Sequence, residues 1–287
     1  MFGRQNMKVY IPFDYYTSTG GPTTFMGNLK TYLQNKQYPF VKNIDEADTI
    51  FFPISFDQHI LRSFKQRGGK IIQRLDGVYY PSKHGNEYTK FNQDVKDIYA
   101  NLSDFVVFQS QYSKKQCYTM FGEKDESQYQ IVVNGVDKSI FYPSEVNTKL
   151  GAEINFVTTG NFRNVDMIEP VVQALDQLRN KLSFRLNVIG PITNPELGKF
   201  FQRDYVVTWG DKKLPEVAEF LRRFDIFVYS HLNPPCPNSV VEAIASGLPL
   251  VGFDSGAMSE LAFFSKSCWL LYQMNYSKNM QILTLTG

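Results

Sequence analysis

The sequence predicts an α/β protein with two doubly wound domains, each a parallel sheet between layers of helices. Three observations indicate this fold. Short apolar runs alternate with amphipathic stretches along almost all of the 287 residues. The short runs are apolar on both faces, as in parallel strands that are covered on both sides. The alternation is interrupted once, at residues 134–148, by a polar segment with Asn-Gly and Pro that is typical of an interdomain linker.

The first predicted domain comprises residues 1–143. Runs of apolar and β-branched residues predict strands at Lys8–Phe13, Thr49–Ile54, Lys70–Leu75, Asp104–Gln109 and Gln130–Asn134. The amphipathic stretches between them predict helices at Thr23–Lys36, Asp57–Arg67, Glu87–Leu102 and Gln111–Phe121.

The second predicted domain comprises residues 144–287. Its expected strands are Asn155–Thr159, Phe184–Ile189, Val206–Trp209, Ile226–Ser230, Leu248–Gly252 and Cys268–Tyr272. Its expected helices are Glu169–Asn180, Leu214–Phe224, Val240–Ser246 and Gly256–Phe264. Doubly wound domains bind ligands beyond the carboxyl ends of their strands. Two such faces across a cleft would suit an enzyme with two substrates.

Composition and charge exclude several classes of function. Hydrophobic residues make up 43% and charged residues 20%, as in globular proteins. A net charge of +2 gives no indication of the basic surface that nucleic-acid-binding proteins have. A weak basic excess in the first half leaves open only a peripheral contact with anionic lipid. The sequence predicts neither a signal peptide nor a membrane-spanning run, and three widely spaced cysteines favour the reducing cytoplasm.

The most informative stretch runs from Asn233 to Gly256. A Pro-rich turn precedes a short predicted helix, and a strand and a small-residue loop follow it. A helix start that faces strand ends presents bare backbone N–H groups to an anion. The residues at this start, followed by the carboxylate of Glu242, are Pro237, Asn238, Ser239 and Val240. The arrangement suits a nucleotide diphosphate.

Several motifs occur in a characteristic order, namely Gly20-Gly21, Arg74–Gly77, Ile131–Asp137 with Phe141 and Pro143, Gly160–Arg163, Cys236–Glu242 and Gly247–Pro249. Through them, residues 8–272 resemble the retaining glycosyltransferases of family 4 (glycosyl transferases group 1). The resemblance implies a GT-B fold, with two Rossmann-like domains facing across a cleft. It also implies transfer of a hexose from a nucleotide diphosphate sugar to an acceptor hydroxyl with retention of configuration. No metal or other cofactor is implied.

The resemblance further implies that the donor binds domain 144–287, and that a glycan, glycolipid or small-molecule acceptor binds domain 1–143. Glu242 matches the family glutamate that accepts hydrogen bonds from the two ribose hydroxyls, and an ionised carboxylate has acceptors for both. A second interpretation is a capping box, because Ser239-x-x-Glu242 fits that pattern. The two roles are compatible.

Arg163 follows a predicted strand at the position where the family places a guanidinium on the diphosphate. Positive charge there would stabilise the negative charge that develops on the leaving group. The alternative is a solvated surface arginine. Gly21 and Gly160 would allow close approach to phosphate or sugar, or are simple turn glycines.

The segment Gly210–Lys213 corresponds to the loop that contacts the base, where Lys212 or Lys213 could approach the phosphates. Asp76 ends a strand of the first domain, which suits either an acceptor contact or an Asx turn. The histidines, His59, His84 and His231, are isolated in sequence, which disfavours a metal site. His231 would lie near the donor or serve as a cap or packing residue.

Three departures from the family pattern stand out. Pro234 occupies the position of the first glutamate in Glu-x7-Glu, which addresses the donor sugar. The family lysine that follows the Arg163 position is missing, and the next lysine is Lys181. After Tyr272 we expect only a short helix, so the domains would lack the family's closing helices.

These departures leave two alternatives beside a transferase of polysaccharide or glycoconjugate synthesis. One is a catalytically impaired nucleotide-sugar-binding partner of an active transferase. The other is a nucleotide-sugar epimerase on the same architecture. In either case we expect a cytoplasmic location, with any membrane contact peripheral.

Overall fold

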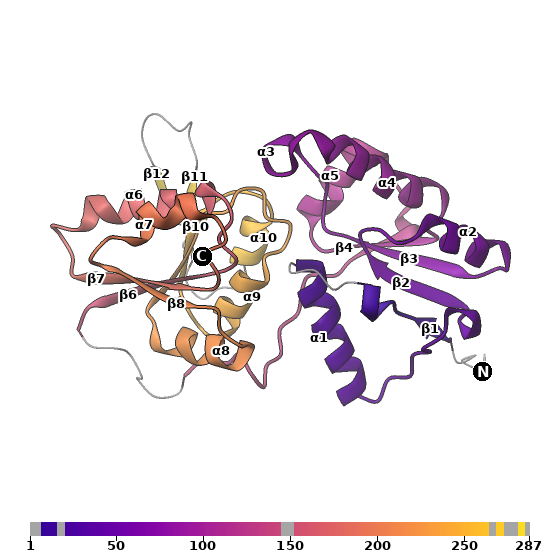
Figure 1. Cartoon of the computed structure of the whole chain (residues 1–287), viewed down its shortest axis with the longest axis horizontal. Coiled ribbons are helices and arrows are strands. Elements are labelled where there is room, and N and C mark those ends of the chain that lie inside the picture. The colour runs from indigo at the N-terminus through magenta and orange to yellow at the C-terminus, as the bar shows by residue number, and fades with distance from the viewer. Residues whose placement is uncertain (1–6, 16–20, 145–151, 264–267, 273–280, 285–287) are drawn as a thin grey trace. The chain divides into compact units, whose positions relative to one another are not determined.

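The computed structural model describes residues 7–15, 21–144, 152–263, 268–272 and 281–284 (Figure 1). The chain divides into two compact units, Met1–Asn134 (unit 1) and Gly135–Gly287 (unit 2). Each unit contains one sheet. The predicted α/β class with two parallel-sheet domains is confirmed, although the chain divides after Asn134 rather than after residue 143.

The sheet of unit 1 consists of five parallel strands in the order β1-β2-β3-β4-β5. They are Val9–Tyr10, Thr49–Pro53, Lys70–Leu75, Phe105–Phe108 and Tyr129–Ile131. The first strand is shorter than predicted, because Phe13–Tyr15 forms a 3-10 turn instead.

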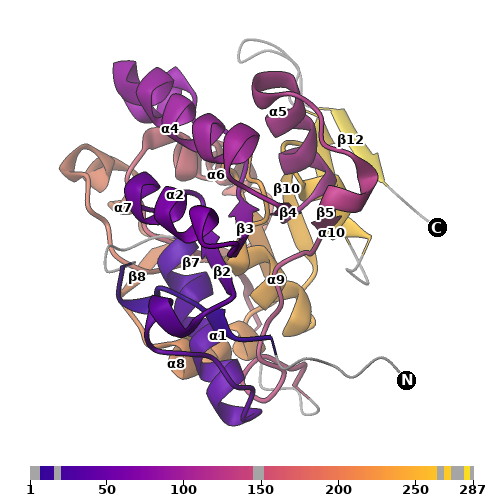
Figure 2. The same ribbon diagram turned by 90° about the vertical axis from the view of Figure 1, so that its right-hand side faces the viewer.

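Helices lie on both faces of this sheet. They are α1 (Gly21–Asn35), α2 (Gln58–Gln66), α3 (Pro81–His84), α4 (Tyr88–Asn101) and α5 (Gln111–Phe121). Ile50 and Phe52 of β2 share one buried cluster with Leu61 of α2. Phe51 points the other way, to Phe25 of α1, with ring centroids 6.2 Å apart. In both views α2 and α4 lie on one side of β2 and β3, and α1 lies on the other (Figures 1 and 2).

The sheet of unit 2 has the order β12-β11-β10-β9-β6-β7-β8. These strands are β6 (Ile154–Thr159), β7 (Phe184–Ile189), β8 (Val206–Gly210), β9 (Ile226–Tyr229), β10 (Leu250–Phe253), β11 (Cys268–Tyr272) and β12 (Gln281–Thr284). The chain moves outward from β6 through β7 to β8 and then returns to β9 on the other side of β6. The strand order therefore reverses between β6 and β9. The strand β12 pairs antiparallel with β11, whereas the sequence analysis expected only a helix after Tyr272.

The helices of unit 2 are α6 (Glu169–Leu178), α7 (Gly198–Phe201), α8 (Leu214–Arg223), α9 (Asn238–Ala245) and α10 (Met258–Ala262). An apolar cluster fills one face of the sheet, where Leu186 and Val188 pack with Leu175 of α6 and Phe200 of α7.

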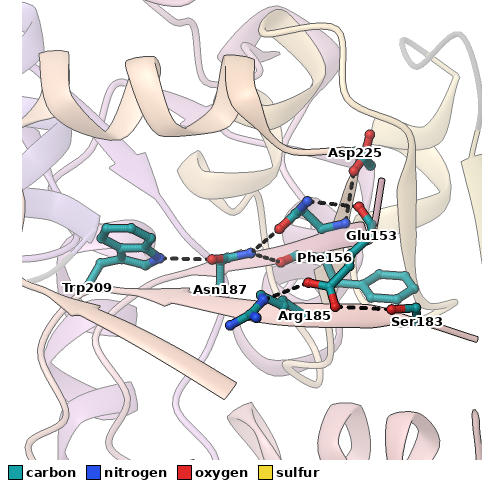
Figure 3. A network of polar contacts seen from close by, with 8 residues as sticks. Glu153, Phe156, Ser183, Arg185, Asn187, Trp209 and Asp225 are labelled. Atoms are coloured by element: carbon teal, nitrogen blue, oxygen red, sulfur yellow. Dashed lines mark hydrogen bonds and ion pairs between the residues drawn. The ribbon is translucent and has the colours of Figure 1, made fainter. Parts of the chain in front are cut away.

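A polar network crosses β6, β7 and β8 (Figure 3). Asn187 accepts from Trp209 Nε1 at 3.0 Å and donates to the Phe156 carbonyl at 3.1 Å. Asp225 accepts from the Asn155 amide at 2.9 Å, which ties the start of β6 to the start of β9. Since Asn155 and Asn187 are buried, these bonds satisfy polar groups that would otherwise be costly to bury.

Residues 140–143 explain the position of the boundary. Arg222 of α8 donates to the Ile140 carbonyl at 3.0 Å and lies 4.5 Å from the centre of the Tyr142 ring. Phe141 is buried, and the Pro143 ring lies against Gly247. This part of the predicted linker therefore belongs to unit 2, and its continuation at residues 145–148 lies outside the described residues.

Candidate functional site

The candidate site lies at the carboxyl edge of the unit 2 sheet, where the strand order reverses. Strands β6 and β9 are neighbours there, and Gly160 and His231 follow them closely. A Cβ built on Gly160 would lie 3.7 Å from Cε1 of His231, so the two loops meet at this point. A reversal of strand order opens a crevice between adjacent loops, which is where open α/β sheets bind ligands.

Along this edge, three glycines leave the backbone without side chains. Gly190, after β7, has φ +124°, and a Cβ there would lie 1.9 Å from the Gly160 carbonyl oxygen. Only glycine fits at such a distance and such a φ. The Gly190 amide donates to the Gly210 carbonyl at 2.8 Å. Gly160, Gly190 and Gly210 therefore join the ends of β6, β7 and β8 through their backbones.

The segment that carries Arg163 is rigidly held. Phe162 is fully buried, and its amide donates to the Pro191 carbonyl at 2.9 Å. The Arg163 carbonyl accepts from Asn194 Nδ2 at 3.0 Å. The residue itself is exposed. The backbone thus fixes where the Arg163 side chain begins.

The start of α9 differs from the prediction. The helix begins at Asn238, and Pro237 is an N-cap without a side-chain hydrogen bond. The amides of Val240 and Val241 both donate to the Pro237 carbonyl, at 3.1 and 3.2 Å. Ser239 therefore lies inside the helix, and the capping-box interpretation of Ser239 and Glu242 is wrong. Val240 is fully buried, so its side chain contributes packing rather than a ligand contact.

Glu242 is the fifth residue of α9 and lies beyond the first turn of the helix. Its side chain is partly buried. Burial raises the pKa of the Glu242 carboxyl to about 7. Raised carboxyl pKa values in a site indicate a group that functions through its charge or its proton.

The Pro-rich turn packs onto the loop after β10. The Pro234 carbonyl accepts from the Ala257 amide at 2.8 Å, and the Asn233 amide donates to Ser255 Oγ at 2.8 Å. Gly256 has φ +63°, and a Cβ there would lie 2.3 Å from the Pro234 carbonyl oxygen. Pro234 therefore contributes a structural carbonyl where the family pattern has a glutamate.

The loop after β8 presents charged groups to solvent. Gly210 ends the strand with φ +67°, and a Cβ there would meet no atom within 4 Å. Lys212 is partly exposed, and Asp211 and Lys213 are exposed. The structure therefore leaves space around Gly210 beside two lysines, of which Lys213 is the more exposed.

Gly21 and Asp76 belong to unit 1 and are described separately. Gly21 is the first residue of α1, and Gly20 lies outside the described residues. Asp76 forms an ion pair with Arg74 at 2.7 Å, where the Arg74 side chain is only 3% exposed. The proposed Asx turn is therefore not needed to explain Asp76.

Arg74 is the central residue that sequence reasoning missed. Its guanidinium also donates to Gln109 at 3.0 Å and to Asn134, and it lies 3.8 Å from the centre of the Phe25 ring. The available signal was an arginine next to the last residue of a predicted strand, followed two residues later by a carboxylate.

Metal sites and membrane spans are two further points. Within the described ranges, no group of three or more His, Cys, Asp or Glu side chains could hold a metal ion. Of the helices in these ranges, none has the length and apolar character to cross a bilayer.

The family match lies within the second unit. Residues 153–273 match the family model described as glycosyl transferases group 1. No match was found among curated protein sequences.

The matches to solved structures extend over residues of both units. Anabaena HepE, solved with UDP and glucose, is 15% identical with a TM-score of 0.63, over 82% of this chain and 72% of that one. Sucrose-phosphate synthase from Thermosynechococcus elongatus is 15% identical with a TM-score of 0.66, over 88% and 65%.

WaaG, a glycosyltransferase of lipopolysaccharide biosynthesis, is 11% identical with a TM-score of 0.61, over 90% and 84%. At such identities the likeness establishes the fold. The chain has the GT-B fold of these proteins, and its second unit contains a glycosyl transferases group 1 domain.

Proposed function

We propose that the protein is a retaining hexosyltransferase of family 4, which transfers a hexose from a nucleotide diphosphate sugar to an acceptor hydroxyl. One observation carries the proposal. At the strand-order reversal of unit 2, bare glycine backbone, the first turn of α9 and the carboxylate of Glu242 belong to one edge of one sheet. The complex of HepE with UDP and glucose supports a donor of this kind.

The roles follow from the chemistry of a sugar–diphosphate bond. Glu242 in its ionised form accepts from the ribose hydroxyls. The amides of Asn238 and Ser239, in the first turn of α9, face the diphosphate. Arg163 stabilises the charge that grows on the leaving group, an effect worth about 10²–10³ in rate for one such donor. Gly210 and Lys212 lie toward the base.

Retention on this site requires no carboxylate at the position of Pro234. The departing phosphate oxygen itself takes the proton of the acceptor hydroxyl. The acceptor oxygen then joins the sugar on the same face from which the diphosphate leaves. A metal ion is not required, since Arg163 and the helix start supply positive charge. Exclusion of water around the reacting centre would suppress hydrolysis of the donor.

The acceptor is proposed to bind unit 1, near Gly21 and Asp76. Its class would be a glycan, a glycolipid or a small molecule, in polysaccharide or glycoconjugate synthesis. A cytoplasmic location, with at most peripheral membrane contact, accords with use of a nucleotide sugar.

A second candidate is a nucleotide-sugar-binding partner without transfer activity. Pro234 favours it, because this position has no carboxylate to address the donor sugar. The lack of a lysine between Arg163 and Lys181 favours it too.

The test begins with thermal shift against UDP-, GDP- and ADP-sugars. The sugar that binds is then incubated with and without candidate acceptors, and free nucleotide is measured. Release that rises with acceptor supports transfer, and binding without release supports the partner role. A changed sugar still joined to the nucleotide would indicate an epimerase. Glu242→Ala should weaken nucleotide binding sharply while the melting temperature stays similar, and unchanged affinity would refute the ribose role.

A further inference from the structure

His231 occupies the point where the strand order of unit 2 reverses. It lies two residues beyond the end of β9, which pairs in parallel with β6 in the register Val157↔Phe227. A side-chain atom on Gly160 would lie 3.7 Å from Cε1 of His231. The imidazole therefore stands beside the bare backbone that the proposed diphosphate would approach.

A column of rings holds the imidazole at this edge. Phe227, Tyr229 and His231 alternate along the chain, so they point to the same face of the sheet. The rings of Phe227 and Tyr229 are 6.5 Å apart, and those of Tyr229 and His231 are 4.4 Å apart and 31° from parallel. Tyr229 is buried, which blocks any movement of His231 inward.

The backbone around His231 is equally constrained. Ser230 Oγ donates to the Asp166 carbonyl at 3.1 Å, which ties the end of β9 to the loop after β6. Asn233, with φ +54°, turns the chain away directly after His231 and Leu232. The ring is thus presented at a fixed position.

A second observation points to a ligand at this edge. Thr159, the last residue of β6, is only 5% exposed, and its hydroxyl has no hydrogen-bond partner among the described residues. Buried hydroxyls are usually satisfied, so the end of β6 carries a polar group whose bonding capacity is unused in the described structure. Thr159 directly precedes Gly160, the residue that lies beside the His231 ring.

We infer that His231 is a diphosphate-binding residue, donating a ring N–H to a phosphate oxygen of the nucleotide sugar beside Gly160. The inference rests on the proposed function and deepens it. His231 supplies a donor at the diphosphate, where the family pattern has a lysine after Arg163 and this chain has none.

The experiment compares the affinities for UDP and UMP, measured by calorimetry, in wild type and variants. His231→Phe keeps a ring against Tyr229 and removes both ring nitrogens. We expect it to weaken UDP binding by about 10- to 100-fold, as for loss of a charge-assisted hydrogen bond, and UMP binding far less. His231→Gln, which retains an N–H donor, should recover part of the preference for UDP.

The control is His59→Phe on α2 of unit 1, where the side chain is exposed, and it should change neither affinity. Unchanged UDP affinity in His231→Phe, or equal losses of UDP and UMP, would overturn the inference. If wild type binds UDP and Glu242→Ala abolishes binding while His231→Phe does not, the proposed function survives and only the role of His231 fails. If wild type binds no nucleoside diphosphate at all, both fail.

Discussion

The two sheets of this chain end in different ways. In unit 2 the strand order reverses, and glycines leave backbone bare at the ends of β6, β7 and β8. In unit 1 the described strands run consecutively, and the carboxyl edge around β3 is filled by the protein's own groups. There Arg74 already binds Asp76, Gln109 and Asn134. The carboxyl edge of unit 1 around β3 is thus closed by an internal ion pair and hydrogen bonds, whereas the described carboxyl edge of unit 2 is lined by glycine backbone.

The strongest test of this contrast removes the buried cation of unit 1. Arg74→Met should lower the free energy of unfolding by about 3 kcal/mol or more, because Asp76 and Gln109 lose their partner away from water. Denaturant titration measures the change. Arg62→Met, on the exposed surface of α2, is the matched control and should cost less than about 0.5 kcal/mol. An Arg74 variant as stable as wild type would show that the edge is not structural.

The next test adds one methyl group to the bare edge of unit 2. Gly190→Ala should cost about 2–3 kcal/mol and disturb nucleotide binding, because its Cβ would meet the Gly160 carbonyl at a φ that alanine avoids. Gly210→Ala also has a positive φ but meets no atom within 4 Å, so about 1 kcal/mol is expected. Equal costs at the two positions would mean that the close approach at Gly190 is unimportant.

The last test concerns the pH dependence that Glu242 contributes to stability. Burial raises the pKa of its carboxyl to about 7 in the folded protein, above the value of about 4.3 in an unfolded chain. The folded state therefore holds a proton that the unfolded state lacks between these two values, and stability falls as pH rises through this window. Glu242→Gln should raise the melting temperature at pH 8 and leave it unchanged at pH 4.

Nucleotide binding should show the opposite trend in wild type. A carboxylate accepts from ribose hydroxyls only when ionised. Affinity for the nucleotide should then decline as pH falls below about 7, and Glu242→Gln should lack this decline. A pH-independent affinity in wild type would remove Glu242 from the ribose.

Much of the fold was predictable from the chain alone. The bounds of β3, β7 and α5 agree with the prediction, because each is a clear apolar or amphipathic run bordered by polar residues or glycine. The strand β12 was missed, since its pairing with β11 depends on tertiary context rather than on local pattern.

The site was less predictable where it depends on strand order. The start of α9 was misplaced because Pro237 caps the helix without a side-chain bond, so the usual signal is missing. Arg74 was recognised only as part of a motif, and its burial among Gln109, Asn134 and Phe25 depends on segments far apart in the sequence. His231 lies beside Gly160 because β9 pairs with β6. The local sequence does not predict which strands pair.

The strap formed by residues 140–143 has a practical consequence for dissecting the molecule. A truncation made at the predicted boundary would strip Phe141 from its buried position and leave Arg222 without the Ile140 carbonyl and the Tyr142 ring. A chimera or an isolated second half should instead begin at Gly135. The chain is therefore best divided between Asn134, whose side-chain oxygen accepts a hydrogen bond from Arg74, and Gly135. This position precedes the strap and leaves it in unit 2.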